Sequence, residues 1–428
     1  MKKVINIAVV GLGNVGAYLL NELNKKKKEI ENKTGRKINV EAISAKNINK
    51  KRKFKINKKI FYKNPLNIIN QKKIDILFEL IGQSDGISKK IVEKSLKKKI
   101  HVITANKALI SKHGELLAFL AEKNKVNLEF EASVAGGIPI LRTIKDGLST
   151  NKIRKVVGIL NGTSNYILTE MQRSNKNFDE VLKKAQLLGY AEPNPKFDLN
   201  GNDVLSKIKI LSSLSFNKKI SRFKNLMSGI ENIELKDIKM ANELGMKIKL
   251  LGITEIINGK LFERVHPCLL RKESYIANIN GVMNAVILDG FPVGESVLQG
   301  EGAGPGPTSS SLMSDLLSIL RGNIKYPFGI SYKNRNKINS YDVNKYTNSL
   351  YLRFEVMDKP GVLSQITKNL AKYKISIERL IQIPEHKKKT ASIIIITHKT
   401  NELNSKKCLK SFKLNKNILK YPTLIRLF

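Results

Sequence analysis

The segment of the sequence with the most potential for chemistry is residues 185–207, AQLLGYAEPNPKFDLNGNDVLSK. It gathers Glu192, Asp198, Asp203 and Lys207 among proline, glycine and asparagine residues. Asp203 and Lys207 are four residues apart on a predicted helix, so both side chains project from one face. An ammonium beside a carboxylate can stabilise charge on a substrate oxygen and give it a proton. An ordinary ion pair on the surface has the same spacing, so the pattern alone leaves both interpretations open.

A glycine motif near the start of the chain predicts a nucleotide site. The motif directly follows an apolar run, Val4–Val10, and opens a segment with helical spacing; it reads Gly11-Leu12-Gly13-Asn14-Val15-Gly16. Gly11 allows the tight turn, Gly13 lets the backbone approach a pyrophosphate, and Gly16 lets helix and strand pack closely. The phosphates would bind unpaired amides at the helix N-terminus. A glycine turn without a ligand is the alternative interpretation.

The end of the second expected strand, Ile38–Ser44, bears on which nucleotide binds. NAD sites commonly carry an acidic residue there for the ribose hydroxyls, whereas Glu41 lies inside this strand rather than at its tip. Basic residues follow the strand instead, namely Lys46, Lys50, Lys51 and Arg52. Positive charge suits a 2′-phosphate, so the sequence favours NADP and keeps NAD possible. The lysine bias of the whole chain is the competing explanation.

The elements that must position these residues alternate between strands and helices near the N-terminus. This order predicts an α/β fold, with a Rossmann-type, doubly wound parallel sheet in a nucleotide domain over residues 1–130. Residues 131–320 read as an α+β catalytic and dimerisation domain, and the polar, basic segment 321–348 as a linker. Residues 349–428 show the order βαββαβ of a ferredoxin-like fold. The strands expected in the first domain are 4–10, 38–44, 74–80, 100–104 and 126–130.

The composition indicates a globular protein of the reduced cytoplasm. The 428 residues include 77 Lys and Arg against 36 Asp and Glu, a formal net charge of +41. These lysines are spread along the chain without the interleaved aromatic residues of a nucleic-acid surface, so we expect no nucleic-acid partner. Cys268 and Cys408 cannot form a disulfide framework, and a pair of buried thiols is expected. No apolar run reaches the roughly 20 residues that span a bilayer, so no membrane partner is expected.

Several blocks of the sequence, taken in order, resemble the homoserine dehydrogenase family. The family's catalytic signature is matched at Ala185, Gly189, Tyr190, Glu192, Pro195, Asp198, Leu199, Gly201, Asp203 and Lys207. Further blocks that look like the family's are TANKALI (104–110), EASVAGGIPI (131–140), NGTSNYILTEM (161–171) and GEGAGPGPTSS (300–310). The segment DKPGVL (358–363) resembles an ACT domain. No aspartate kinase domain precedes these blocks, so the resemblance implies the monofunctional form with a C-terminal ACT regulatory domain.

The resemblance implies the NAD(P)-dependent interconversion of L-aspartate 4-semialdehyde and L-homoserine, in threonine, methionine and isoleucine biosynthesis. Hydride passes between the nicotinamide and the aldehyde carbon, and the carbonyl oxygen then needs a proton. The family correspondence makes Lys207 the proton donor, while Asp203 would bind the substrate's reacting end and hold Lys207. Glu192 would bind the substrate ammonium, and Lys107 would lie beside cofactor and substrate. For Asp198, substrate binding and a structural role both stay open.

The same resemblance implies a monovalent cation such as Na⁺ and further contacts to the cofactor. Glu131 would give the cation a carboxylate, whereas Val134, Gly136 and Ile138 would give backbone carbonyls. This cation would fix the hinge between the nucleotide and catalytic domains, and a plain glycine turn is the alternative. The residues implied for the cofactor, besides the first glycine motif, are Lys46, Lys107, Gly189, Gly302 and Gly304.

Some positions of the sequence differ from the family pattern, and other functions are considered beside it. Gln83 stands where a second glycine is common, Lys46 stands where an arginine is frequent, and His113 could border the site. Another NADP-linked dehydrogenase or semialdehyde reductase would lack the Asp203–Lys207 block, and a non-catalytic regulator would have lost those residues. The resemblance implies a homodimer through the middle domain, or a homotetramer if ACT domains pair, with threonine as the possible effector.

Overall fold

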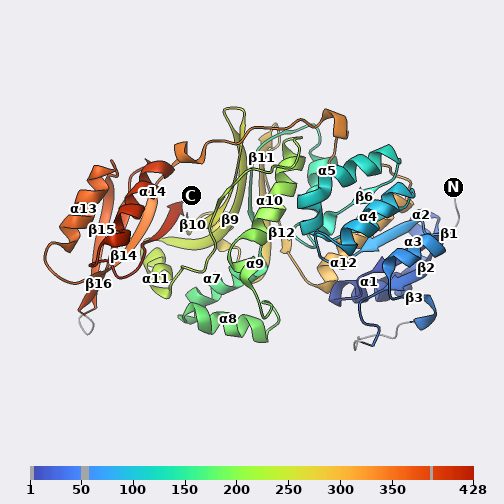
Figure 1. Cartoon of the computed structure of the whole chain (residues 1–428), viewed down its shortest axis with the longest axis horizontal. Helices are drawn as coiled ribbons and strands as arrows, with labels where there is room; N and C mark the ends of the chain where they lie inside the picture. The colour runs from blue at the N-terminus through green and yellow to red at the C-terminus, as the bar shows by residue number, and fades with distance from the viewer. Residues whose placement is uncertain (1–3, 50–56, 386–388) are drawn as a thin grey trace.

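The computed structural model describes residues 4–49, 57–385 and 389–428. The chain forms an elongated molecule of three lobes, which follow one another along the sequence from blue to red (Figure 1). Lys50, Lys51 and Arg52, predicted near the cofactor, lie outside the described residues. None of the helices in the described part of the chain has both the length and the hydropathy that a membrane span requires.

The first lobe is built on a six-stranded parallel sheet, which confirms the predicted Rossmann-type fold. The strand order is β3-β2-β1-β4-β5-β6, so the order reverses between β1 and β4. Ligands of such sheets bind at this switch point, outside the carboxyl ends of the strands. The strands are β1 (Val4–Val10), β2 (Lys37–Ser44), β3 (Phe61–Tyr62), β4 (Ile76–Glu79), β5 (His101–Thr104) and β6 (Leu128–Glu129).

Helices cover both faces of this sheet, as the burial of β1 shows. Ile7 and Val9 pack toward one face with α1 and α12, whereas Ala8 and Val10 pack toward the other with α4 and α5. Helix α12 (Pro305–Leu320) therefore returns to the first lobe from far along the chain, although it ends the segment expected as the middle domain. The other helices are α1 (Asn14–Lys25), α2 (Lys27–Thr34), α3 (Pro65–Gln71), α4 (Ile87–Lys97) and α5 (Lys107–Lys123).

The middle lobe is a mostly antiparallel sheet in the order β12-β11-β7-β9-β10, with helices packed against it. Helix α10 (Asn202–Ser215) lies against β9 at Gly252, where a Cβ atom would stand 2.5 Å from Ile208 and 2.7 Å from Val204. Glycine at this position allows the close approach that fixes the helix carrying Asp203 and Lys207. The other elements are β7 (Lys152–Ile159), β9 (Met246–Ile257), β10 (Lys260–Arg271), β11 (Met283–Phe291), β12 (Gly294–Glu301), α7 (Gly162–Ser174), α8 (Phe178–Leu187), α9 (Lys196–Leu199) and α11 (Leu235–Glu243).

The third lobe confirms the βαββαβ order predicted for the C-terminal residues. Its last strand, β18, also pairs in parallel with β10, through Cys268 with Arg426 and Leu269 with Leu427. One sheet therefore runs from β12 in the middle lobe to β15 in the third. The elements are β14 (Leu350–Met357), α13 (Val362–Lys372), β15 (Ile377–Glu385), β16 (Thr390–Thr397), α14 (Glu402–Ser411) and β18 (Thr423–Leu427).

Residues 321–348, expected as a linker, pack against the first two lobes. Arg335 is buried, with its Nη2 atom 2.6 Å from Glu115 Oε1 of α5 and its guanidinium 3.9 Å from the centre of the Phe328 ring. Cys268 and Cys408 are buried free thiols, as predicted.

Candidate active site

Asp203 and Lys207 lie in the first two turns of α10 and are buried. Gly201, with a φ of +88°, lets the chain turn into this helix. Asp203 is 1% exposed and Lys207 is 7% exposed. The Nζ atom of Lys207 lies 2.8 Å from Asp203 Oδ2 and 2.5 Å from the carbonyl oxygen of Leu160, which follows β7. The pair is interior, so the surface ion pair that the sequence left open is wrong.

A second lysine reaches Asp203 from the first lobe. Lys107 is the first residue of α5, and its Nζ atom lies 2.7 Å from Asp203 Oδ1. Asn106 caps the helix by accepting a bond from the Leu109 N–H, and its Nδ2 donates to the carbonyl of Gln83. The Asp203 carboxylate therefore joins the two lobes at the carboxyl edge of the parallel sheet, where ligands of such sheets bind.

Burial and neighbouring charges set the protonation states of these three groups. Burial opposes the Asp203 anion, but Lys207, Lys107 and a bond from Asn161 outweigh it and hold the pKa of Asp203 well below its usual range. Burial lowers the pKa of Lys207, and the charge of Lys107 lowers it further, against the pull of Asp203. For Lys107, burial is outweighed by Asp203, so its pKa is raised. Lys207 is therefore the stronger acid of the two lysines.

Asp198 belongs to the same group of charges through Asn161. The Nδ2 atom of Asn161 donates to Asp198 Oδ1 and to Asp203 Oδ2, each at 2.8 Å. Burial raises the pKa of Asp198, and the Asp203 charge adds to this. Asn161 begins the NGTSNYILTEM block but was not among the residues predicted for the site. An Asn before a Gly-Thr pair is typical of a helix N-cap.

Glu192 lies apart from the buried group, in the exposed loop between α8 and α9. Its charge is near enough to favour the protonated form of Lys107. Gly189 ends α8 with a φ of +75°, and the Tyr190 ring packs 5.0 Å from that of Tyr166. The Thr163 hydroxyl donates to the Tyr190 carbonyl at 2.6 Å, so the start of the loop that carries Glu192 is anchored.

The first glycine motif has the geometry of a phosphate-binding turn. A Cβ atom on Gly11 would stand 2.4 Å from the Leu80 carbonyl oxygen, and one on Gly16 would stand 2.0 Å from that of Gly11. At Gly13, the exposed N-cap of α1, a Cβ atom would meet nothing within 4 Å. Among the described residues no side chain caps this helix, so its first N–H groups face open space that suits a pyrophosphate.

The end of β2 lies beside this turn, because the Gly11 N–H donates to the Ser44 carbonyl at 2.9 Å. The described residues that follow, 45–49, include the exposed Lys46 and no acid. Glu41 lies back inside the strand and pairs with Lys72 at 3.0 Å. The charge at the strand tip is therefore positive, as a 2′-phosphate requires.

Gly302 and Gly304, both predicted near the cofactor, differ in their surroundings. A Cβ atom on Gly302 would stand 2.0 Å from the Asn284 amide, so Gly302 is tightly packed. Gly304 begins α12 with a φ of +113°, and a Cβ atom there would meet nothing closer than Pro307, at 3.6 Å. Gly304 is thus the one of the two with room for a ligand beside it.

The segment predicted to hold a cation combines a buried carboxylate with a tight turn. Each carboxylate oxygen of Glu131 accepts one backbone N–H at 2.8 Å, from Leu141 or Arg142, and so keeps a second lone pair. Ala135 and Gly136 have positive φ, and the Gly136 carbonyl accepts a bond from Ser311 at 2.7 Å. The described residues contain no group of three or more His, Cys, Asp or Glu side chains that could hold a metal ion. An alkali cation would therefore depend on backbone carbonyls, a donor set that fits its hard character.

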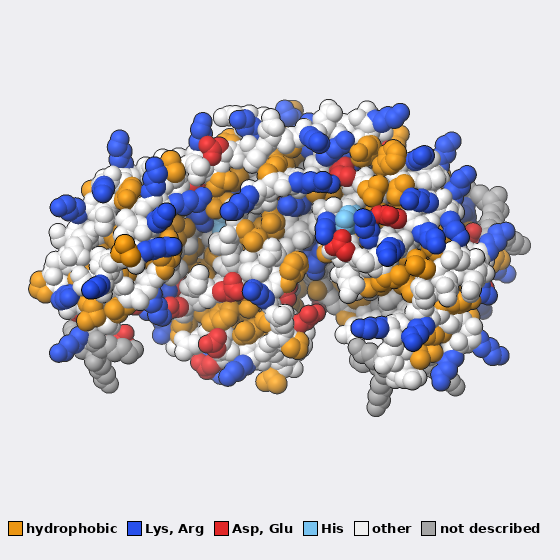
Figure 2. All heavy atoms as spheres, viewed as in Figure 1, with side chains coloured by type: hydrophobic (Ala, Val, Ile, Leu, Met, Phe, Trp, Pro, Cys, Tyr) orange, Lys and Arg blue, Asp and Glu red, His pale blue; other side chains and the backbone are white. Residues whose placement is uncertain are grey.

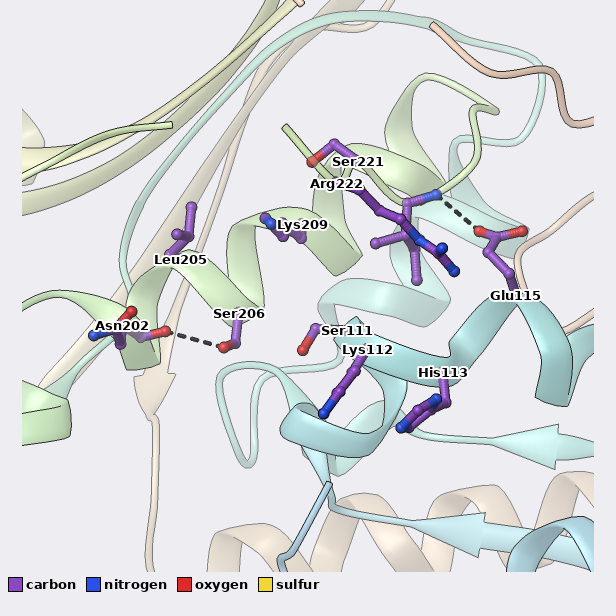
Figure 3. Close-up of a pocket in the computed structure, with 11 residues that line it drawn as sticks. Ser111, Lys112, His113, Glu115, Asn202, Leu205, Ser206, Lys209, Ser221 and Arg222 are labelled. Carbon is purple, nitrogen blue, oxygen red and sulfur yellow. Dashed lines mark hydrogen bonds between the residues drawn. The ribbon is translucent and has the colours of Figure 1, made fainter. Parts of the chain in front are cut away.

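A cavity of about 570 Å³ lies between α5 and α10, on the side of α10 away from the buried pair. Figure 3 shows Ser111, Lys112 and His113 of α5 on one side and Ser206 of α10 on the other. His113 Nε2 lies 2.9 Å from Asp85 Oδ1. Asp203 and Lys207 are not among the described residues that line this cavity. The cavity beside His113 is therefore separate from the buried pair.

The fold and the site together define a nicotinamide-dependent dehydrogenase: a Rossmann-type domain with an open phosphate turn, and a buried ammonium–carboxylate pair at its carboxyl edge. Comparison with known protein families gives the same class of enzyme. The homoserine dehydrogenase family matches residues 139–317, its NAD-binding domain matches residues 11–131, and the ACT domain matches residues 350–412.

Relatives match the whole chain. The homoserine dehydrogenase of Neisseria gonorrhoeae is 38% identical over 431 residues, covering 99% of each chain. That of Helicobacter pylori is 37% identical over 428 residues, covering 100% of each. The crystal structure of a homoserine dehydrogenase from Thiobacillus denitrificans superimposes with a TM-score of 0.89 at 34% identity, covering 100% of this chain and 98% of that one.

The chain belongs to the homoserine dehydrogenase family. It is an NAD(P)-dependent oxidoreductase of amino-acid biosynthesis, which reversibly reduces L-aspartate 4-semialdehyde to L-homoserine.

Proposed function

We propose that Lys207 donates the proton when this chain reduces L-aspartate 4-semialdehyde and accepts it in the reverse direction. The observation that carries this proposal is the placement of the Lys207 ammonium. Its bonds to Asp203 and to the Leu160 carbonyl use two of its three hydrogens, and among the described residues no other bond takes the third. That hydrogen is available to a substrate oxygen, where it stabilises the developing charge and supplies the proton.

The charges around Lys207 suit this task. Burial and Lys107 lower the pKa of Lys207, which makes the ammonium a stronger acid. Asp203 opposes this shift and keeps the ammonium charged before the reaction. The net result is an ammonium that is a stronger acid than an ordinary lysine, with Asp203 limiting how far its pKa falls.

The surrounding residues suit an amino-acid substrate. Glu192, at the exposed rim, binds the substrate's α-ammonium, and Asp203 binds the end of the substrate that reacts. Lys107 is about one third exposed (35%) and lies beside both cofactor and substrate. Asp198 is engaged by Asn161, which favours the structural role over direct substrate binding.

NADP is the cofactor that we propose. When bound, the nicotinamide supplies or accepts the hydride at the substrate carbon. The N–H groups at Gly13 bind the pyrophosphate, Lys46 attracts the 2′-phosphate, and Gly189 and Gly304 lie toward the nicotinamide. In support, a hyperthermophilic archaeal homoserine dehydrogenase of the same fold, with a TM-score of 0.61 and 23% identity, has been solved in complex with NADPH.

A monovalent cation such as Na⁺ is proposed at the start of the middle lobe. Glu131 would supply a carboxylate oxygen, and Val134, Gly136 and Ile138 would supply backbone carbonyls. The Gly136 turn packs against Gly302, since a Cβ on Gly136 would stand 2.5 Å from the Gly302 carbonyl. A cation there would brace the cofactor loop against the hinge.

The ACT domain is proposed to bind an amino-acid effector, with threonine as the candidate. A cavity of about 290 Å³ is lined by residues 356–363 together with Gln382 and Ile393. Gln382 Nε2 donates to Asp358 Oδ1 at 3.3 Å across it. We further propose a homodimer through the middle lobe, or a homotetramer if ACT domains pair, in the cytoplasm.

The test is the rate of NADPH and NADH oxidation with aspartate semialdehyde, for wild type, Lys207→Ala and Lys209→Ala. Lys207→Ala should lose roughly 10²–10⁴-fold in kcat, the contribution of a general acid, while still binding NADPH. Lys209, on the same helix, lines the neighbouring cavity instead, and its alanine variant should keep near wild-type kcat. Comparable turnover in Lys207→Ala and wild type would overturn the assignment.

A further inference from the structure

We infer that Asn161 is the positioning residue of the catalytic pair, an inference that rests on the proposed role of Lys207. Asn161 lies in the turn between β7 and α7, where it is 6% exposed and forms the N-cap of α7. It acts on the reaction only through the carboxylates of Asp198 and Asp203, to which it donates hydrogen bonds. Its place in the turn explains how the middle-lobe sheet controls groups that come from two other helices.

The side-chain amide of Asn161 uses its full hydrogen-bonding capacity. Its Nδ2 atom donates to Asp198 Oδ1 and Asp203 Oδ2, each at 2.8 Å. Its Oδ1 atom accepts from the Ser164 N–H at 2.8 Å and from the Ser164 hydroxyl at 2.6 Å. Two donors and two lone pairs are all that an amide offers. The orientation is fixed, because the reversed amide would place its oxygen against two carboxylates.

The residue before Asn161 holds the other half of the catalytic pair. The carbonyl oxygen of Leu160 accepts the bond from Lys207 Nζ at 2.5 Å. Two consecutive residues of one turn therefore hold the ammonium and the carboxylate of the pair. The distance between Lys207 and Asp203 is set by the helix and by this turn together, and a shift of the turn would disturb both contacts.

Asn161 also solves an electrostatic problem without adding charge. Asp198 and Asp203 repel each other, since the Asp203 charge raises the pKa of Asp198. A neutral amide between them gives each carboxylate a hydrogen bond, which favours the ionised form of each. A cation in the same place would add a third positive charge beside Lys107 and Lys207, and would weaken the proton donor's hold on Asp203.

The test separates this role from helix capping by using substitutions that keep the cap. Serine and aspartate are both good N-caps, so Asn161→Ser and Asn161→Asp both keep the cap. Asn161→Ser should unfold with a midpoint close to that of wild type, whereas Asn161→Asp should unfold earlier, because it buries a third carboxylate beside two others. Serine cannot reach the two carboxylates. For Asn161→Ser we expect kcat to fall by roughly 10²-fold, the cost of misplacing a reacting group by about 1 Å. The KM for aspartate semialdehyde should change less than kcat, since Glu192, which binds the substrate ammonium, is untouched.

The pH profile gives a readout that a purely structural residue would not change. In Asn161→Asp a new carboxylate faces charged groups on three helices, namely Asp198 of α9, Asp203 and Lys207 of α10, and Lys107 of α5. We expect a larger loss of kcat at neutral pH than in Asn161→Ser. Activity should recover in part as the pH falls, because a protonated carboxyl at this position again offers one donor.

The matched control is Asn177→Ser, the same substitution at the N-cap of the neighbouring helix α8. Among the described residues, no hydrogen bond joins Asn177 to a residue of the site. This control should keep wild-type kcat and pH profile. Wild-type kcat in Asn161→Ser would overturn the inference and leave Lys207 as proton donor intact. A loss of stability with an unchanged pH profile would also overturn it, since Asn161 would then be a cap alone. Loss of the Lys207 assignment would be recognised separately, by an active Lys207→Ala variant.

Discussion

Lys207 and Lys249 are both buried lysines of the middle lobe, with exposed fractions of 7% and 2%. Burial lowers the pKa of both, and that of Lys249 falls to about 7. Each also has a like-charged neighbour, Lys107 or Lys247, which lowers its pKa further. Burial and pKa alone would mark either lysine as a candidate for proton transfer.

Their partners differ. Lys249 Nζ, on β9, is enclosed by neutral oxygens: the Ile279 carbonyl at 2.5 Å, Asn165 Oδ1 at 3.0 Å, Asn280 Oδ1 at 3.2 Å and Thr169 Oγ1 at 3.4 Å. These acceptors engage all three of its hydrogens. Lys207 has a carboxylate, one carbonyl and one hydrogen to spare. A buried lysine that donates a proton therefore needs two things. It needs an anion nearby that favours the ammonium form, and it needs one N–H that no protein acceptor engages.

Asp203→Asn should have the largest effect on activity. Like Lys249, Lys207 would then be bonded to neutral oxygens alone. Without the anion, burial and Lys107 are left to lower the pKa of Lys207. We expect kcat for reduction to fall by about 10²-fold or more, and its alkaline limb to move to lower pH. Steady-state NADPH oxidation over a range of pH measures both. Asp179→Asn, an exposed acid in the first turn of α8, is the control. A wild-type pH profile in Asp203→Asn would contradict the role given to the anion.

Lys249→Met should have the opposite result, with stability lost and chemistry kept. The variant removes the donor to the buried Asn165 Oδ1, and a buried oxygen left without its partner costs about 1–3 kcal/mol of unfolding free energy. The value of kcat per folded molecule should stay near that of wild type. Urea unfolding and active-site titration separate the two quantities. A drop in kcat without a drop in stability would show that Lys249 takes part in the reaction.

The pH dependence of that stability difference has a definite sign. The pKa of Lys249 is about 7 in the folded chain and about 10.4 in the unfolded chain. Between these values the unfolded chain binds more protons, so the penalty of the buried charge is full below the lower value and disappears as the pH rises through the window. Wild type should gain on Lys249→Met by at most about 1.4 kcal/mol per pH unit there. A flat difference would mean that the surrounding oxygens keep Lys249 charged.

Much of the fold and part of the site were predictable because their signals are local. Buried parallel strands read as continuous apolar runs, as in Val4–Val10, and a glycine motif after such a strand has one structural meaning. The spacing of Asp203 and Lys207 placed both on one helix face before any tertiary structure was known. The packing of these elements then followed the rules for alternating strands and helices.

The remaining features depend on contacts between distant segments, for which the sequence carries no local signal. The Leu160 carbonyl holds Lys207, yet a backbone carbonyl has no identity in a sequence. Asn161 reads as a helix cap, and its bonds to two carboxylates depend on where α9 and α10 pack. The pairing of β10 with β18 joins two domains whose strands look complete by themselves.

The smallest expected effect concerns Lys247, the like-charged neighbour of Lys249. Its Nζ atom bonds Asn278 Oδ1 at 2.7 Å at the surface, and its charge lowers the pKa of Lys249. Lys247→Ala should raise the pKa of Lys249 and shift the stability window to higher pH, with a change at neutral pH within about 0.5 kcal/mol. Lys247→Arg keeps the charge and should leave the window in place.

Identical windows in the alanine and arginine variants would show that Lys247 does not act through its charge. The result bears on Lys207 as well. The charge of Lys107 is shared with Asp203, at 2.7 Å, whereas no acid among the described residues pairs with Lys247. A measurable effect of Lys247 would therefore establish that a positive charge without an acidic partner is enough to lower the pKa of a buried lysine.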